Sequence, residues 1–225
     1  MESTAMESPA RCQPPSLRAA AFGCLVLCVA FVVLLSWLTR GMQVWTLDAR
    51  RGAMAATEQL MAPAVSLRDA RGNPFIPWGV ASTSGVVYLV DFIYTRCNSV
   101  CNALGPEFLQ LQRAIEAQGL DRRVRLLSIS IDAGRDDSPS LAAYEARQRA
   151  DGRIWRVTAP LTTTGQSALL RALNVIAIPD GMGGFVHNGE IHVIDQRGVV
   201  LGLCNYAEFG QALQVAQRAA QKAGR

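Results

Sequence analysis

Two cysteines four residues apart, Cys97 and Cys101, have the types and spacing that most clearly allow chemistry. Thiolates are nucleophiles and also soft metal ligands. On a helix, residues i and i+4 lie roughly 5 to 6 Å apart at Cβ, whereas a disulfide prefers about 3.8 Å. Two thiolates around one soft ion, each at about 2.3 Å if zinc is a guide, fit that separation with less distortion. The spacing favours a metal site and leaves a redox pair open as the alternative.

The elements around this pair predict that it lies at the start of a helix. The apolar, β-branched run Val86–Tyr94 predicts a buried strand. From Cys101 onward, Leu104, Phe108 and Leu111 recur at the spacing of an amphipathic helix. A helix N-terminus carries a partial positive charge and free N–H groups, both of which lower the pKa of a cysteine. We therefore expect both sulfurs at a helix N-terminus that favours the thiolate.

The chain beyond the pair alternates between strand and helix patterns. We expect strands over Arg123–Ile131 and Ile154–Thr158, helices over Pro139–Ala150 and Gly165–Leu173, a hairpin of strands Glu190–Asp195 and Val199–Leu203, and a closing helix over Tyr206–Gln221. Alternation followed by a hairpin is typical of an α/β fold with a mixed sheet flanked by helices.

One stretch near the start of the chain is apolar enough to lie in a membrane. Residues 19–39 carry no charge, and a helix needs roughly 20 residues to cross a bilayer. A cleaved signal peptide is the alternative, but its apolar core would span about 7 to 15 residues and end in a small-residue cleavage site. The longer run here ends in Trp37, Leu38 and Thr39, which favours one uncleaved transmembrane helix. Arginines flank it on both sides, so charge does not fix its orientation.

The chain is thus expected to have four parts. Residues 1–18 are polar and contain prolines, which predicts a disordered tail. Residues 19–39 are the membrane anchor, residues 40–63 a tether with some helical tendency, and residues 64–222 one globular domain.

Charge and cysteine content exclude two classes of protein. The net charge of +4 is mild and the arginines are scattered, so we expect no nucleic-acid partner. Of the six cysteines, only Cys97, Cys101 and Cys204 fall in the globular domain, too few for a disulfide scaffold. We expect Cys204 to be a buried small apolar residue. His192, within a strand pattern, is expected to be packed and not to bind a metal.

Three ordered blocks of this sequence resemble the SCO/SenC family. The blocks are Asp91-Phe92-Ile93-Tyr94-Thr95-Arg96-Cys97 followed by Cys101, then Ser128-Ile129-Ser130-Ile131-Asp132, then His187 eight residues before Asp195. The resemblance covers roughly residues 64–222, and the three blocks together are far more specific than the cysteine pair alone.

The resemblance implies a membrane-anchored, thioredoxin-like domain in the bacterial periplasm, or, alternatively, on the mitochondrial inner membrane. Proteins of this family bind copper and help to assemble the binuclear copper centre of cytochrome c oxidase. Carried over by position, the copper ligands are Cys97, Cys101 and His187, and Asp132 matches an acidic position near the site. The implied partner is the copper-bearing subunit of the oxidase or another copper protein.

The chemistry of these residue types agrees with copper. Thiolates favour Cu(I), and imidazole accepts either Cu(I) or Cu(II). His187 lies in the segment Gly181–Gly189, whose four glycines predict a mobile loop that could close on the ion and release it. The chain departs from the family pattern at Asn98, Ser99 and Asn102, where members commonly have proline, aspartate and proline.

Two functions of different classes follow for this pair. The first is a copper metallochaperone, a binding protein with no turnover of its own. The second is a thiol-disulfide oxidoreductase that reduces a partner's cysteines, with Cys97 attacking and Cys101 resolving the mixed disulfide. A thiol peroxidase is weakly supported, because no separate peroxidatic motif is evident. His187 separates the first two functions, because a dithiol reductase has no need of it.

Overall fold

The computed structural model describes residues 17–39, 41, 52, 54–55, 57, 60–79, 85–96, 100–181 and 183–223, apart from the side chains of residues 100–104 and 223. The chain divides into two compact units, Met1–Ala49 and Arg50–Arg225. We call the second the globular unit. The expected tail, residues 1–18, lies outside the described residues except for its last two.

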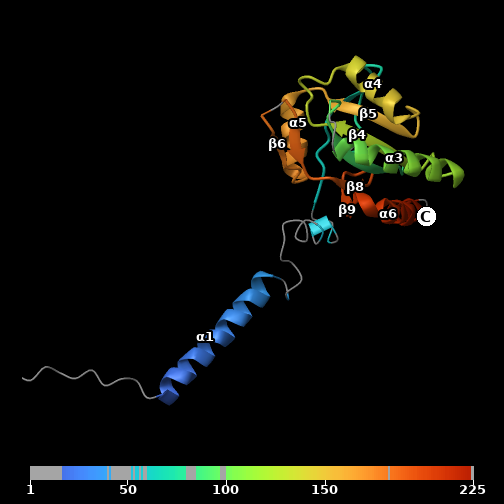
Figure 1. The fold of residues 1–225 in the computed structure, drawn as a ribbon. Coiled ribbons are helices and arrows are strands. Elements are labelled where there is room, and N and C mark those ends of the chain that lie inside the picture. Colours follow the sequence, from blue (N-terminus) through green and yellow to red (C-terminus); the bar gives the residue numbers. More distant parts are fainter. Residues whose placement is uncertain are drawn as a thin grey trace, which may run out of the picture. The chain divides into compact units, whose positions relative to one another are not determined.

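The first unit contains helix α1 (Leu17–Leu38), which covers the expected anchor (Figure 1). It is the one helix among the described residues that is long and apolar enough to cross a membrane. None of its residues is buried, and large apolar side chains such as Phe22 and Trp37 are exposed. A helix of a soluble protein would normally bury an apolar face.

The globular unit is built on a seven-stranded mixed sheet of order β2-β1-β5-β4-β3-β8-β9. The three central strands, β5, β4 and β3, are parallel, and all other pairs are antiparallel. The strands of the sheet are β1 (Leu67–Asp69), β2 (Pro74–Phe75), β3 (Val87–Ile93), β4 (Val124–Ser130), β5 (Trp155–Pro160), β8 (Glu190–Ile194) and β9 (Val200–Asn205). The expected mixed sheet with a terminal hairpin is confirmed.

The helices fall near their expected positions. They are α3 (Val100–Ala117), α4 (Ser138–Gln148), α5 (Thr163–Ala172) and α6 (Phe209–Ala223), with a 3₁₀ turn, η1 (Tyr206–Glu208), before α6. Two of them start at side-chain caps, as their sequences favour. The Asp137 carboxylate accepts from the Ser140 N–H, and the Thr162 hydroxyl accepts from the Gly165 N–H.

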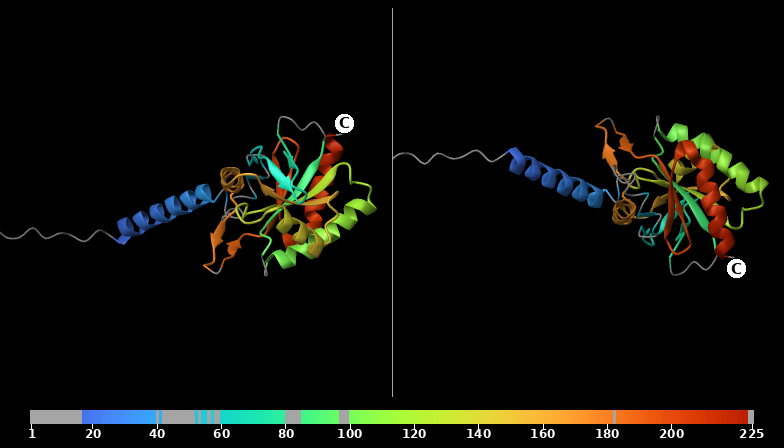
Figure 2. Two further views of the ribbon diagram at one scale, coloured as in Figure 1. Left: turned by 90° about the horizontal axis from the view of Figure 1, so that it is seen from above. Right: turned by 90° about the horizontal axis from the view of Figure 1, so that it is seen from below.

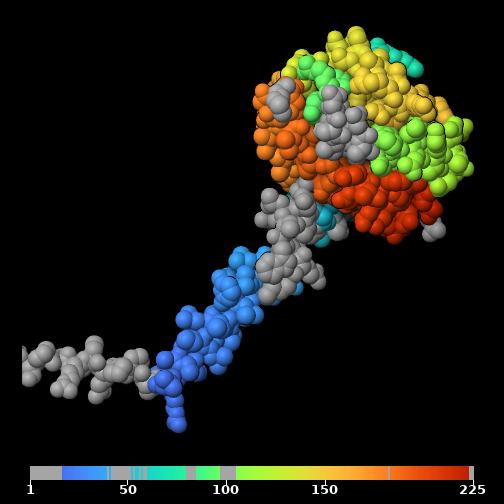
Figure 3. Space-filling model, viewed as in Figure 1, coloured from blue at the N-terminus to red at the C-terminus, as the bar shows by residue number. Residues whose placement is uncertain are grey.

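Helices α3 and α6 contact each other (Figure 3), and their apolar side chains belong to one cluster with the same face of the sheet. The apolar side chains of α3 that recur at helical spacing face the sheet, because Phe108, Leu111 and Ile115 are all fully buried. They pack against alternate residues of β3, including Val87 and Leu89. The α3 helix is therefore fixed on the sheet by its apolar stripe, and it begins seven residues after the last residue of β3.

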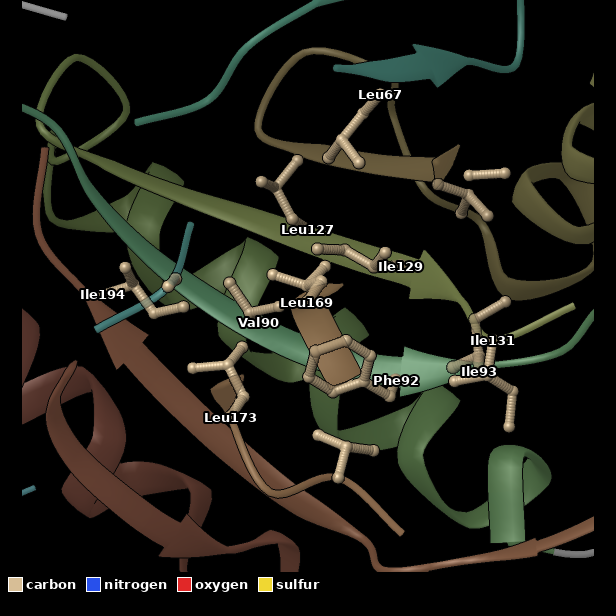
Figure 4. Close-up of a cluster of buried hydrophobic side chains, with 14 of the residues drawn as sticks. Leu67, Val90, Phe92, Ile93, Leu127, Ile129, Ile131, Leu169, Leu173 and Ile194 are labelled. Carbon is tan, nitrogen blue, oxygen red and sulfur yellow. The ribbon is translucent and has the colours of Figure 1, made fainter. Parts of the chain in front are cut away.

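A second apolar cluster contains the other side chains of the central strands (Figure 4). Val90 and Phe92 of β3 and Ile129 of β4 meet Leu169 and Leu173, which come from α5 and its C-terminal cap. Helix α4 lies along β5 and also contacts α3. The parallel strands are thus buried on both faces, as their continuous apolar sequences predict.

Part of the expected tether packs on the globular unit. Leu60 and Ala62 are buried in the core, and the Leu60 carbonyl accepts from the Val200 N–H while the Ala62 N–H donates to the Gly198 carbonyl. We call residues 60–62 the strap. The rest of residues 40–63 lies mostly outside the described residues, so the boundary at residue 63 stays a prediction.

A second, two-stranded sheet projects from the globular unit (Figure 2). It pairs β6 (Ala177–Pro179) with β7 (Phe185–His187), so Ala177 lies opposite His187. The expected loop around His187 is therefore wrong in its local structure, because His187 ends a strand. The hydrogen bond of the Asp180 N–H to the Gly184 carbonyl closes the turn, and cross-strand pairing overrides the flexibility of the glycines.

Candidate metal centre

The cysteine segment follows the carboxyl end of β3. After Ile93 come Tyr94 and a turn at Thr95 and Arg96, and α3 begins at Val100. Cys101 thus occupies the first turn of α3, as predicted. Cys97 lies outside the described residues, as does the side chain of Cys101. The predicted sulfur separation therefore stays a prediction.

The hairpin brings His187 to this end of β3. The His187 ring lies edge-on to the ring of Tyr94 with centroids 6.2 Å apart, and Phe185 packs on Tyr94 in the same way at 5.5 Å. His187 is buried, with 8% of its surface exposed. Because Tyr94 precedes Cys97 by three residues, the structure places the predicted histidine beside the strand that leads into the cysteine segment.

One hydrogen bond defines which ring nitrogen of His187 can bind a metal. Its Nδ1 lies 3.1 Å from the Asn188 carbonyl oxygen. A carbonyl can only accept, so Nδ1 donates in this bond, and in the neutral ring Nε2 then carries the lone pair that a metal requires. Donation of one ring N–H to a backbone carbonyl is the usual arrangement for a metal-binding histidine.

Asp132 links the two sides of the site electrostatically. Its Oδ2 lies 2.7 Å from Arg135 Nε and 3.3 Å from Arg96 Nη2. The Arg135 guanidinium in turn lies over the Phe185 ring, 5.8 Å from its centroid. Asp132 therefore touches the turn before Cys97 directly and the histidine hairpin through Arg135, which supports the predicted place of this residue near the site.

Asp136 is a site residue that the sequence analysis missed. Its carboxylate accepts hydrogen bonds from the Thr95 N–H at 3.0 Å, the Thr95 hydroxyl at 2.7 Å and the Ser130 hydroxyl at 2.6 Å. Nothing in the local sequence distinguishes Asp136 from Asp137, which caps α4. The signal that could have found it is its place after β4, at the edge of the sheet where β3 also ends.

Asp91 is a second buried acid close to the centre. It lies in the middle of β3, on the face covered by α3, and only 1% of it is exposed. Burial raises the pKa of its carboxyl to about 7, opposed by a hydrogen bond with Ser128 and by the charge of His187. Among the described residues no donor reaches its Oδ1.

Two other candidates lie in the core, as expected. His192 is buried in β8 with its ring edge-on to Phe92 at 5.3 Å. Cys204 is buried in β9. Burial and the nearby Glu208 raise the pKa of the Cys204 thiol, which makes it a poor nucleophile.

The predicted donor set suits copper. It consists of two cysteine sulfurs, of which Cys101 lies at a helix N-terminus, and a histidine whose tautomer leaves Nε2 for a metal. Thiolate and imidazole ligands fit copper in both of its biological oxidation states. Among the side chains that the structure describes, no group of three or more His, Cys, Asp or Glu could hold a metal without Cys97 and Cys101.

Comparison with known proteins gives consistent matches. The family model described as SCO1/SenC matches residues 55–222. A relative described as a SCO1 protein homolog from Bacillus subtilis is 28% identical over 125 residues, which cover 53% of this chain. The match spans only 62% of the length of that relative.

Solved structures share the fold of the globular unit. Bradyrhizobium japonicum ScoI with copper bound has a TM-score of 0.58 and 22% identity, over 71% of this chain and 99% of that one. BsSco, described with a disulfide switch as a member of the Sco family of cytochrome c oxidase assembly proteins, has a TM-score of 0.61 and 19% identity, over 72% and 94%. The thioredoxin-like fold expected from the sequence is confirmed.

Proposed function

This chain belongs to the SCO1/SenC family, and from that premise we propose that it is a copper metallochaperone. Cys97, Cys101 and His187 hold the ion, and the chain delivers it to the binuclear copper centre of cytochrome c oxidase. Copper bound to a ScoI of similar fold, and the oxidase-assembly role stated for BsSco, support this proposal.

One observation supports the proposal most strongly. The ring of His187 packs beside Tyr94 and points Nδ1 at the Asn188 carbonyl, although His187 follows Tyr94 by 93 residues. A dithiol reductase would need no imidazole there, whereas a copper site needs a third ligand close to the sulfurs. The burial of the ring restricts its rotation, so less entropy is lost when it binds the ion.

Helix α1 anchors the protein in the inner membrane, and the globular unit faces the periplasm. The length of α1 and the exposure of its apolar side chains support an anchor. The partner is the copper-bearing oxidase subunit, which presents its ligands on the same side of the membrane. A protein held to that membrane meets the subunit at high effective concentration.

A second candidate function is thiol-disulfide exchange with the partner's cysteines. It is favoured by the place of Cys101 in the first turn of α3, where the helix dipole stabilises a thiolate, and by the disulfide switch described for BsSco. Reduced cysteines are needed before a dithiol site can take copper, so this activity and copper delivery are compatible.

Anaerobic Cu(I) titration of the full chain in detergent tests the first function. We expect one ion per chain, and at least tenfold weaker binding in His187→Ala and in Cys97→Ser. The chain has two histidines, so His192→Gln is the matched control and should bind like the wild type. A wild-type chain that fails to retain one copper would falsify this function. Weak binding by His187→Ala together with unchanged disulfide exchange would separate the two candidates.

A further inference from the structure

A buried carboxylate holds the turn from which the cysteine segment departs. Only 1% of Asp136 is exposed, and its carboxylate accepts three hydrogen bonds, two of them from Thr95 and one from Ser130. A buried carboxylate is costly unless donors satisfy it. The hydroxyl bonds of 2.6 and 2.7 Å have the short lengths of O–H···O⁻ bonds, which are about twice as strong as neutral ones.

Thr95 is restrained on every polar atom. Besides its two bonds to Asp136, its carbonyl oxygen accepts from Arg147 Nη2 of α4 at 2.6 Å. The segment that carries Asp136 is itself fixed, because Arg68 Nη2 donates to the carbonyls of Asp136 at 2.8 Å and Ala133 at 3.0 Å. The turn at Thr95 is therefore tied to β1, β4 and α4 at once.

This restraint acts on the residue that lies between Tyr94, which supports His187, and the cysteine segment. Cys97 follows Thr95 by two residues, and two residues span at most roughly 7 Å. Tyr94, which precedes Thr95, carries the ring on which His187 and Phe185 pack. A shift of Thr95 would thus change the distance from Cys97 to the His187 hairpin.

We propose that Asp136 is a positioning residue for the metal centre, acting through Thr95 to hold Cys97 at the separation from His187 that copper requires. The inference rests on the proposed function and extends it beyond the three ligands. Residues that orient ligands change metal affinity by about 10- to 100-fold when they are replaced.

The test compares variants of the full chain in detergent. Asp136→Asn keeps the size of the side chain and removes the charge. Thr95→Val replaces the hydroxyl by a methyl group, whereas Thr95→Ser keeps the hydroxyl and loses the methyl group. Asp137→Asn is the matched control, because Asp137 is the adjacent aspartate and caps α4 without touching Thr95.

Three readouts distinguish positioning from a general effect on folding. Competition with a chelator gives Cu(I) affinity, the Cu(II) electron paramagnetic resonance spectrum reports the ligand geometry, and thermal unfolding gives stability. We expect Asp136→Asn and Thr95→Val to bind copper at least tenfold more weakly with an altered spectrum. Thr95→Ser and Asp137→Asn should stay within twofold of the wild type.

A fourth readout needs no copper. Iodoacetamide alkylates the Cys97 thiolate to a thioether and releases iodide, and peptide mass spectrometry measures the extent of alkylation at Cys97 apart from the other cysteines. If Asp136 acts through Thr95 on the position of Cys97, Asp136→Asn and Thr95→Val should both change the alkylation rate of Cys97 at least threefold, whereas Thr95→Ser and Asp137→Asn should not. A wild-type chain that binds no copper would reject the proposed function, while the alkylation rates would still decide the role of Asp136.

The proposal would be overturned if Asp136→Asn matched the wild type in copper affinity, in spectrum and in Cys97 alkylation. A variant that differed only in thermal stability would show that Asp136 only stabilises the fold. If Asp136→Asn does not fold, the Thr95→Val and Thr95→Ser pair decides alone. Equal copper affinity and equal alkylation rates in that pair would likewise overturn it.

Discussion

At the scale of residues, three buried carboxyls near the centre differ in how they are satisfied. Asp136 receives three hydrogen bonds, and Asp132 pairs with two arginines. Asp91 has an Oδ1 that no described donor reaches, and burial raises the pKa of its carboxyl to about 7. Donors surround the first two carboxyls, whereas ionisation of Asp91 opposes folding.

The raised pKa of Asp91 predicts that the free energy of unfolding falls as the pH rises. Its carboxyl has a pKa of about 7 in the folded chain, against an ordinary value of 3.8 for aspartate. The stabilisation of the folded chain by the protonated carboxyl is fully present below about pH 4 and is lost as the pH rises through about 7. The reason is that the unfolded chain releases this proton at a lower pH than the folded chain does. At about 1.4 kcal/mol per pKa unit, the loss is at most roughly 4 kcal/mol. Asp91→Asn should lack this loss.

Thermal unfolding of the wild type and of Asp91→Asn at pH 5 and pH 8 measures how much stability each loses between the two pH values. The wild type should lose more stability than Asp91→Asn between the two pH values. Asp121→Asn, an aspartate in a surface ion pair with Arg153, is the control and should follow the wild type. Parallel pH profiles for the wild type and Asp91→Asn would contradict the assignment.

The three proposed ligands could be named from the sequence because their residue types carry the chemistry. Cys97 and Cys101 stand out by spacing, and His187 by its register with them in the family pattern. Asp136 could not be found in this way. Its function depends on hydrogen bonds to Thr95, 41 residues earlier in the chain, and such pairings are set by tertiary contacts that no local pattern contains.

At the scale of elements, the histidine hairpin is the least predictable part of the fold. The long strands β3 and β4 are apparent from their apolar runs, whereas β6 and β7 have three residues each among glycines. They form because the inner face of the hairpin packs on the body of the globular unit. Phe185 makes that contact with Tyr94 and Arg135, while Val186 on the other face is 65% exposed.

Phe185→Ala should therefore loosen the hairpin that carries His187. Because Phe185 is only partly buried, we expect a stability loss of about 2 kcal/mol, below the range for a core phenylalanine. Copper affinity should fall at least tenfold, because the histidine loses its support. Val186→Ala, the neighbouring residue on the exposed face, is the control for both measurements. Equal copper affinity in the two variants would show that the packing of Phe185 does not position His187.

At the scale of the whole molecule, the globular unit extends into the sequence expected to be a tether. Leu60 and Ala62 of the strap are buried, and the family match begins at residue 55. A chain that starts at Arg50 should therefore keep the stability of the globular unit, and one that starts at Ala64 should not. Loss of the buried Leu60 side chain and of the strap hydrogen bonds predicts a cost of about 3 kcal/mol.

Denaturant unfolding of the two truncated chains measures this cost. The midpoint should be lower for the chain that starts at Ala64, with a similar dependence on denaturant concentration. Unfolding curves that coincide would show that the strap contributes nothing and that the domain boundary expected at residue 63 is right.

The strap also bears on self-association. It pairs with the start of β9 at Val200, on the outer edge of the sheet, where unpaired N–H and C=O groups would otherwise invite a strand from another molecule. At the opposite edge, β2 has only two residues and begins with Pro74, which has no N–H to donate. Each border of the sheet thus carries a feature that opposes the addition of a strand from another copy of this chain.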